Sequence, residues 1–171
     1  MIYHLWPSQE EYRRDLLLHL ARATTTESYV ATEAPDVVAT YADADDAIAG
    51  VASATLGRAL SDEQWFMFME VSSFVANDAV RHEMAGGQSD ALEATARFFE
   101  AGLAIWGRRL RDGYSAEDLV LLTRAFSRGV TLQAKVDPGP LFDERPWRGD
   151  RARNLYEVGV LALFDALIEP A

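Results

Sequence analysis

The chain has 171 residues, of which 16 are basic and 27 acidic, so its formal net charge is −11 at pH 7. A chain of this length can bury a substantial hydrophobic core without crosslinks, and the absence of cysteine excludes disulfides and thiolate metal sites. The acidic balance opposes nucleic-acid binding by the chain as a whole, because contacts of Lys and Arg with phosphates drive such binding.

The first residues lack the basic and long apolar segments of a signal peptide, and the longest apolar runs are too short to span a bilayer. We therefore expect a cytoplasmic protein with no membrane partner. Apolar residues recur at helical spacing, and no alternating strand pattern is evident. The sequence predicts an all-α bundle of five or six helices.

The first predicted helix covers residues 8–23. Ser8 and Glu11 have the spacing of a capping box, in which the Ser hydroxyl accepts a hydrogen bond from the amide of Glu11. A second helix is expected over residues 35–60, because Pro35 suits the first turn of a helix; a break near Asp43 is the alternative.

A second capping box at Ser61–Gln64 predicts a helix that ends at the pair Gly86 and Gly87. This segment is apolar on nearly all sides, so we expect it to be buried. Ser89 is expected to cap the next helix, which ends near Gly113. Its apolar seam comprises Leu92, Ala96, Phe99, Leu103, Trp106 and Leu110.

Ser115 and Asp118 predict the start of a further helix, which the run Asp137–Pro140 ends. A polar loop follows, and the last helix is expected over residues 151–168. The arginines of this region are expected to pair with nearby acids in solvent; they are Arg145, Arg148, Arg151 and Arg153.

The most informative motif is Ile-Tyr-His-Leu-Trp-Pro-Ser-Gln-Glu at residues 2–10. It resembles the end of the helix-turn-helix of TetR-type transcriptional regulators, which reads approximately Leu-Tyr-x-His-Phe-Pro-Ser-Lys-Glu. The matching positions are Ile2, Tyr3, Pro7, Ser8 and Glu10, with the aromatic Trp6 in place of Phe. Leu5 and Gln9 depart from the pattern, since His and Lys are common there.

The resemblance implies that Tyr3, His4 and Gln9 are a remnant of a DNA-contacting surface; a bland alternative for the first two is an N-terminal tail. Gln9 brings no charge, so its phosphate contact would be weaker than that of a lysine. Residues 1–7 would then be the end of the recognition helix and its turn, and residues 8–171 an effector-binding and dimerisation domain. Because a helix-turn-helix needs its supporting helices, DNA is an expected partner only if the missing N-terminal helices are present.

The resemblance also implies a small, largely apolar effector bound between the core helices. Plain core packing is the alternative for each aromatic residue considered. The candidate pocket residues are Trp65, Phe66, Met69, Ser73, Asn77, Phe98, Phe99 and Trp106.

In this family the last two helices pair with the same two helices of a second subunit, which implies a homodimer. The same faces could instead pack inside one monomer. The candidate interface residues are Leu119, Leu122, Phe126, Val130, Tyr156, Gly159, Val160, Ala162, Leu163 and Ala166.

The resemblance thus implies a TetR-like regulator, expected to be a repressor, whose effector changes its affinity for DNA. The alternative is a headless dimeric protein that senses a ligand or binds a partner without binding DNA. An enzyme is disfavoured, because no acid–base, phosphate-binding or metal motif is evident and the three histidines lack metal-ligand spacing. The sequence implies no cofactor.

Overall fold

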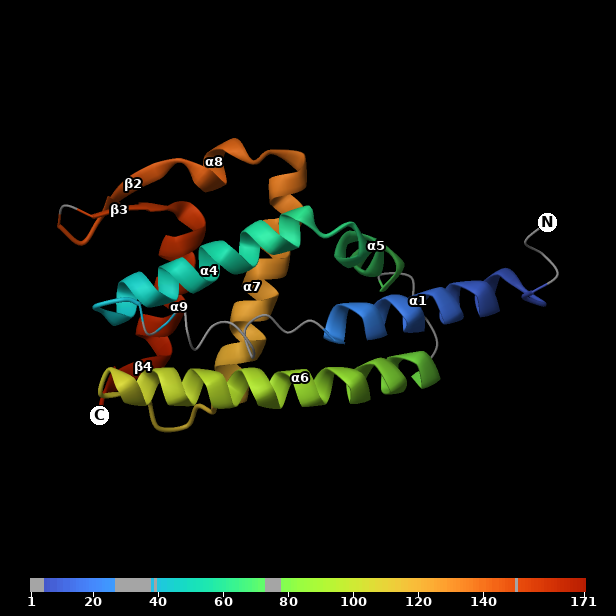
Figure 1. The fold of residues 1–171 in the computed structure, drawn as a ribbon, viewed down its shortest axis with the longest axis horizontal. Coiled ribbons are helices and arrows are strands. Elements are labelled where there is room, and N and C mark those ends of the chain that lie inside the picture. Colours follow the sequence, from blue (N-terminus) through green and yellow to red (C-terminus); the bar gives the residue numbers. More distant parts are fainter. Residues whose placement is uncertain (1–4, 27–37, 39, 73–77, 150) are drawn as a thin grey trace. The chain divides into compact units, whose positions relative to one another are not determined.

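The computed structural model describes residues 5–26, 38, 40–72, 78–149 and 151–171. These residues are mostly helical with a few short strands (Figure 1). The expected helical fold is confirmed in this coarse outline, whereas the expectation of no strands is wrong. Within the described ranges, no helix is both long and apolar enough to cross a membrane.

The chain divides into two compact units. The first unit contains α1 (Gln9–Thr26), α5 (Glu63–Ser72) and the N-terminal half of α6 (Asp78–Ile105). The second contains α4 (Ala44–Ser61), the C-terminal half of α6, β1 (Arg108–Leu110), α7 (Ala116–Val136), α8 (Gly139–Phe142), β2 (Glu144–Trp147), β3 (Arg151–Asn154), α9 (Leu155–Leu167) and β4 (Ile168–Pro170).

Helix α1 begins where the sequence predicts. The amide of Glu11 donates a hydrogen bond to the Ser8 hydroxyl at 3.1 Å, so Ser8 satisfies an amide that the helix leaves without an intrahelical acceptor. The indole nitrogen of Trp6 donates to Asp15 at 3.1 Å, and its ring meets Tyr12 edge-on. These contacts hold the preceding turn against the first turns of α1.

The first unit has a small hydrophobic core between α1 and α5. Leu17 and Leu20 of α1 are buried together with Phe68 of α5. The prediction that the helix starting near residue 61 is buried on nearly all sides is wrong here, because Met67 of α5 is 45% exposed. A short helix packed along one side buries one face, even when its sequence is apolar nearly all round. Residues 73–77, in the middle of the predicted helix, lie outside the described residues.

The start of α5 lies one residue later than predicted. Asp62, rather than Ser61, caps the helix, because its carboxylate accepts a hydrogen bond from the amide of Trp65 at 3.0 Å. Ser61 is the last residue of α4, and its hydroxyl donates to the carbonyl of Arg58 at 2.8 Å.

The predicted boundary at Gly86 and Gly87 is wrong, because both glycines and Ser89 lie inside the continuous helix α6. A glycine inside a helix costs about 1 kcal/mol relative to alanine, which packing elsewhere along a helix can offset. Ala96 and Leu103 of α6 are buried and supply such packing. The helix ends before Gly107, whose φ of 59° is unfavourable for residues with a side chain.

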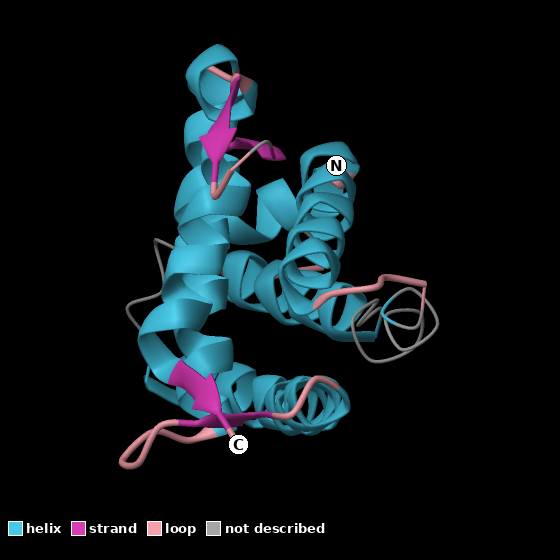
Figure 2. Cartoon of the chain, turned by 90° about the vertical axis from the view of Figure 1, so that its left-hand side faces the viewer, coloured by secondary structure: helices cyan, strands magenta, loops and turns pink. Residues whose placement is uncertain are grey.

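The residues after α6 form β1 rather than further helix. β1 pairs antiparallel with β4 near the C-terminus (Figure 2). Leu110 lies opposite Ile168, and Arg109 opposite Glu169. Glu169 forms ion pairs with Arg109 and, at 3.5 Å, with Arg111. Three-residue strands are too short to show an alternating pattern, and this pair joins segments that are distant in the chain.

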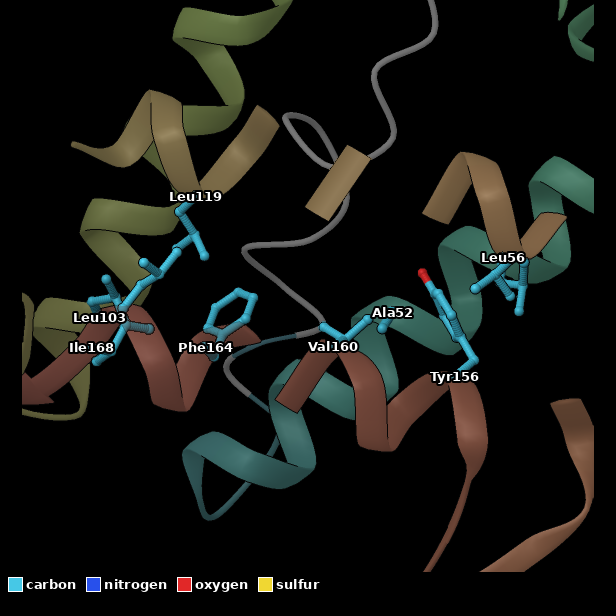
Figure 3. Packing of buried hydrophobic residues seen from close by; sticks show 10 residues of the cluster. Ala52, Leu56, Leu103, Leu119, Tyr156, Val160, Phe164 and Ile168 are labelled. Carbon is cyan, nitrogen blue, oxygen red and sulfur yellow. The ribbon is translucent and has the colours of Figure 1, made fainter. Parts of the chain in front are cut away.

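The second unit has its core where α4, α7 and α9 meet. Leu119 of α7, Tyr156 and Val160 of α9, and Leu56 of α4 are buried in one cluster (Figure 3). A hydrogen bond of 2.6 Å from Ser53 to Glu157 also joins α4 to α9.

The predicted start and end of α7 are confirmed. Ser115 accepts a hydrogen bond from the amide of Asp118 at 3.2 Å, and the Asp118 carboxylate accepts one from the amide of Ser115 at 2.8 Å. These bonds hold the pKa of Asp118 below its usual value, mainly through the backbone amide of Ser115. The helix ends at Val136, directly before Asp137.

The predicted polar loop contains α8 and a hairpin of β2 and β3. Because β3 occupies residues 151–154, α9 begins at Leu155 rather than at residue 151. Asn154 caps α9 by accepting a hydrogen bond from the amide of Glu157 at 2.9 Å. The signal for this start is the Asn-x-x-Glu spacing, a capping box that the sequence analysis missed.

Candidate functional site

Of the three candidate DNA-contacting residues, only Gln9 is among the described residues. Tyr3 and His4 fall outside the described residues. Gln9 is the first residue of α1, and its side chain is exposed. A contact of Gln9 with phosphate stays a prediction.

Three of the eight candidate effector-pocket residues belong to α5 in the first unit. Trp65 and Phe66 are half-buried and meet edge-to-face, with ring centroids 5.0 Å apart. Met69 packs on the buried cluster of α1 and α5. Ser73 and Asn77 lie outside the described residues.

The other candidates, Phe98, Phe99 and Trp106, belong to the second unit. Phe99 meets Phe98 at 5.9 Å and the edge of Phe164 at 5.4 Å between ring centroids, and it packs against the core. The half-buried ring of Trp106 lies next to Gly102. The six described candidates therefore form two groups of three, one in each unit, and the expected effector pocket stays a prediction.

Four of the candidate interface residues are buried inside the monomer, where plain packing accounts for them. Leu119, Val130, Tyr156 and Val160 are at most 8% exposed and belong to the core of the second unit. A residue that its own chain already covers has little surface left for a second subunit, so packing inside the monomer is enough to account for these four.

Two further candidates form the contact between α7 and α9. The ring of Phe126 stacks on that of Tyr156, with centroids 5.8 Å apart and planes 3° apart, and it lies directly over Gly159. The Tyr156 hydroxyl is hydrogen-bonded to Ser127 at 2.9 Å. Burial raises the pKa of Tyr156, and this hydrogen bond partly offsets the increase.

The remaining candidates lie at the surface. Leu122 of α7 is 44% exposed. Ala162 and Ala166 of α9 are also exposed, and Leu163 is half-buried. These residues keep the surface that an interface requires.

The structure adds residues of α7 that the sequence analysis missed. Leu121, Leu132 and Val136 are 54%, 44% and 83% exposed, and Ala125 and Gly129 between them are exposed as well. Spacings of four and three residues place all five on one helical stripe. We call this stripe, together with Leu122, the outer face of α7.

The outer face lies opposite the buried face of the same helix. Each residue advances an α-helix by 100°, which puts Ala125 and Leu132 about half a turn away from the buried Ala116 and Ala134. Helix α7 is thus apolar on two opposite sides. The sequence contains this signal, because apolar residues fill more than the single stripe of an ordinary surface helix.

Helix α9 has a matching exposed row of Leu155, Ala162 and Ala166. The two helices run antiparallel: Tyr156 at the start of α9 meets Ser127, whereas Leu167 at its end accepts a hydrogen bond from Arg111, just before α7.

Helix geometry places both exposed rows on one side of the helix pair. Leu122 and Gly129 lie on one flank of Phe126 along α7, and Ala162 and Ala166 lie on the corresponding flank of Gly159 along α9. Since Phe126 covers Gly159, the two rows adjoin and form one apolar surface.

The arginines around the hairpin form a separate, charged cluster. Arg148 bonds to Asp45 at 3.1 Å and also pairs with Asp165. Arg151 bonds to Asp43 at 2.7 Å. The prediction that arginines of this region pair with nearby acids is confirmed for these two and for Arg153, which pairs with Asp46.

These ion pairs attach the hairpin to the first turn of α4. Asp43 also caps α4, because its carboxylate accepts a hydrogen bond from the amide of Asp46 at 2.9 Å. That bond, and secondly the bond from Arg151, hold the pKa of Asp43 below its usual value. The acidic residues here are fully engaged by arginines and a helix N-terminus, which gives the cluster a structural role.

Comparisons of this chain with protein-family models, with curated proteins and with solved structures found no match.

Proposed function

We propose that this chain is the effector-binding and dimerisation part of a TetR-like transcriptional regulator. The observation that carries the proposal is the exposed apolar surface formed by the outer face of α7 and the adjoining row of α9. The start of α1 also supports the proposal. This helix begins after Ser8, and the resemblance expects the helix that joins the DNA head to the core to begin there.

The apolar surface suits a second copy of the same helix pair. Exposed apolar surface of this kind is unfavourable in water by about 25 cal/mol for each Å², and contiguous patches of it mark interaction sites. Ala125, Gly129, Ala162 and Ala166 bring no bulk, so two such helix pairs can approach closely. A twofold axis would place each pair against its copy and form a four-helix bundle.

In this proposal the effector is small and largely apolar, and it binds in the helical core of each subunit. An effector that binds two states of the dimer with different affinities shifts their populations. The state with the effector bound would hold the DNA heads at a different separation, and the regulator would act as a repressor released by its effector.

A charged substitution on the outer face of α7 tests the proposed dimer. Leu132→Glu would bury a carboxylate at each copy of the interface, and such burial is strongly unfavourable without a partner. Sedimentation equilibrium should give a dimer for the unaltered protein and a monomer for this variant.

Ile105→Glu is the matched control, because Ile105 is also an apolar residue of the second unit and is 69% exposed but lies off both rows. This variant should remain dimeric. A monomer for the unaltered protein, or equal dissociation by both substitutions, would contradict the proposed interface.

DNA binding is tested separately. A gel-shift assay with the neighbouring promoter region would compare this chain with a version extended by any in-frame codons upstream of Met1. Binding by the extended version alone supports the regulator. A dimer that binds no DNA in either form would instead support the dimeric ligand-sensing protein, the class that the net charge of −11 favours.

A further inference from the structure

Two arginines of α7 have no acidic partner among the described residues, whereas several other arginines of the second unit do. Arg124 and Arg128 are four residues apart, so their side chains are neighbours on one helix face. Both are half-buried. Helix geometry places them on the flank of α7 between the buried Val120 and Thr131 and the exposed Leu121.

No carboxylate within the described ranges bonds or pairs with either guanidinium. Arg148 and Arg151 are more exposed, yet each bonds to an aspartate. Arg145 has no such partner in the described structure but is exposed to solvent, which stabilises its charge.

Arg124 and Arg128 therefore carry charge at a place where water is partly excluded. Burial lowers the pKa of both side chains, and the positive charge of Arg128 lowers that of Arg124 further. An arginine nevertheless stays protonated in proteins. Two positive charges that repel each other and are partly desolvated are unfavourable until an anion joins them.

We propose that Arg124 and Arg128 together form a binding site for an oxyanion, the carboxylate or phosphate group of a small ligand. A guanidinium presents a planar fork of N–H donors that matches two oxygens of such a group. Two guanidiniums one helical turn apart can each donate to the same anion. The proposal deepens the proposed function, on which it rests, by giving the effector an anionic group.

The test is thermal unfolding of the whole chain with two probes, inorganic phosphate and hexanoate, at constant ionic strength set with sodium chloride. Hexanol serves as the uncharged counterpart of hexanoate. A ligand that binds the folded state raises Tm. At a concentration well above Kd, at least one anion should raise Tm by on the order of 5 °C.

The variants are Arg124→Gln and Arg128→Gln, with Arg145→Gln as a control of equal charge change. Each of the first two should weaken anion binding at least tenfold, and the control should bind as the unaltered protein does. Without a ligand, Arg124→Gln and Arg128→Gln should leave Tm unchanged or raise it, because each removes a partly desolvated charge that no described acid neutralises.

Each outcome decides the proposal. Binding of phosphate alone or hexanoate alone identifies which group the site takes, and binding of both supports the shared oxyanion chemistry. No shift with either anion, or an equal loss of binding in Arg145→Gln, overturns it. A fall in Tm of the ligand-free Arg124→Gln and Arg128→Gln variants would also overturn it, since it would mean that a carboxylate of the protein already holds these arginines. Because no DNA is used, failure here leaves the regulator proposal standing, and absence of DNA binding leaves the anion site standing.

Discussion

Gly159 of α9 faces the ring of Phe126 so closely that a single added methyl group would overlap it. A Cβ at residue 159 would lie 2.8 Å from Cε1 and 3.0 Å from Cε2 of Phe126, and closer still to the tip of the ring. The ring cannot turn aside freely, because it is stacked on Tyr156. Gly159→Ala should therefore force the contact between α7 and α9 to open.

The magnitude follows from two opposing effects. Adding a methyl group to a packed contact costs about 1–3 kcal/mol. Replacing a glycine inside a helix by alanine stabilises by about 1 kcal/mol. The cost of the overlap should exceed the gain from replacing glycine, so the free energy of unfolding of Gly159→Ala should fall by about 1 kcal/mol. Urea unfolding at a fixed protein concentration measures this change.

Two companion variants separate the effects. Phe126→Leu removes the three ring atoms that the new methyl group would meet, so Gly159→Ala made in that background should become stabilising by about 1 kcal/mol. Gly57→Ala on α4 has no atom within 4 Å of the added carbon and should stabilise by a similar amount. If Gly159→Ala destabilises equally with and without the Phe126 ring, the overlap is not the cause and the reasoning is wrong.

Three further predictions concern single polar groups, and urea unfolding measures the change in the free energy of unfolding in each case. Ser115→Ala removes the cap of α7 and should lower the free energy of unfolding by about 1 kcal/mol, whereas no change would mean that water replaces the cap. Tyr156→Phe removes the bond to Ser127 and should cost about 1 kcal/mol; an equal loss with Ser127→Ala, and no further loss in the double variant, would identify that bond. Asp43→Asn keeps a capping oxygen but loses the charge facing Arg151, and should lower stability at pH 7 by about 0.5 kcal/mol, since the pair is solvent-exposed. Because folding lowers the pKa of Asp43, its contribution is present above the unfolded-state pKa and lost as pH falls through the folded-state value, so the two proteins should become equally stable in acid; a difference independent of pH would contradict this.

Local chemistry made several helix ends predictable from the sequence. Ser8 and Ser115 begin α1 and α7 because a hydroxyl, a main-chain amide and a short spacing suffice to form a cap. Predictions of helix ends failed where a local preference of one residue competed with the packing of the whole helix. Gly86 and Gly87 read as a helix end, yet α6 continues through them, because the cost of a glycine inside a helix is small compared with the burial of Ala96 and Leu103.

The candidate interface was likewise predictable only in part from the sequence. Hydrophobic periodicity identified α7 and α9 as helices with apolar faces, but it could not say which face the monomer itself covers. Leu119 and Tyr156 lie inside, whereas Leu132 and Val136, which were not considered, lie outside. Periodicity identifies the apolar faces of a helix. Only the packing of that helix against other elements decides which apolar face is buried and which is exposed to water.

The sequence by itself determined the acidic charge of the chain, which is a sum over its composition. It also determined the helical character of the chain and the residues that cap α1 and α7, because these depend on residues within a turn or two of one another. Only the tertiary structure decided that β1 pairs with β4 and that the hairpin arginines bond to the start of α4. It also decided that Arg124 and Arg128 are half-buried without a described acid beside them. These features join residues far apart in the chain, and their free energy depends on distances and water exclusion that a linear pattern does not contain.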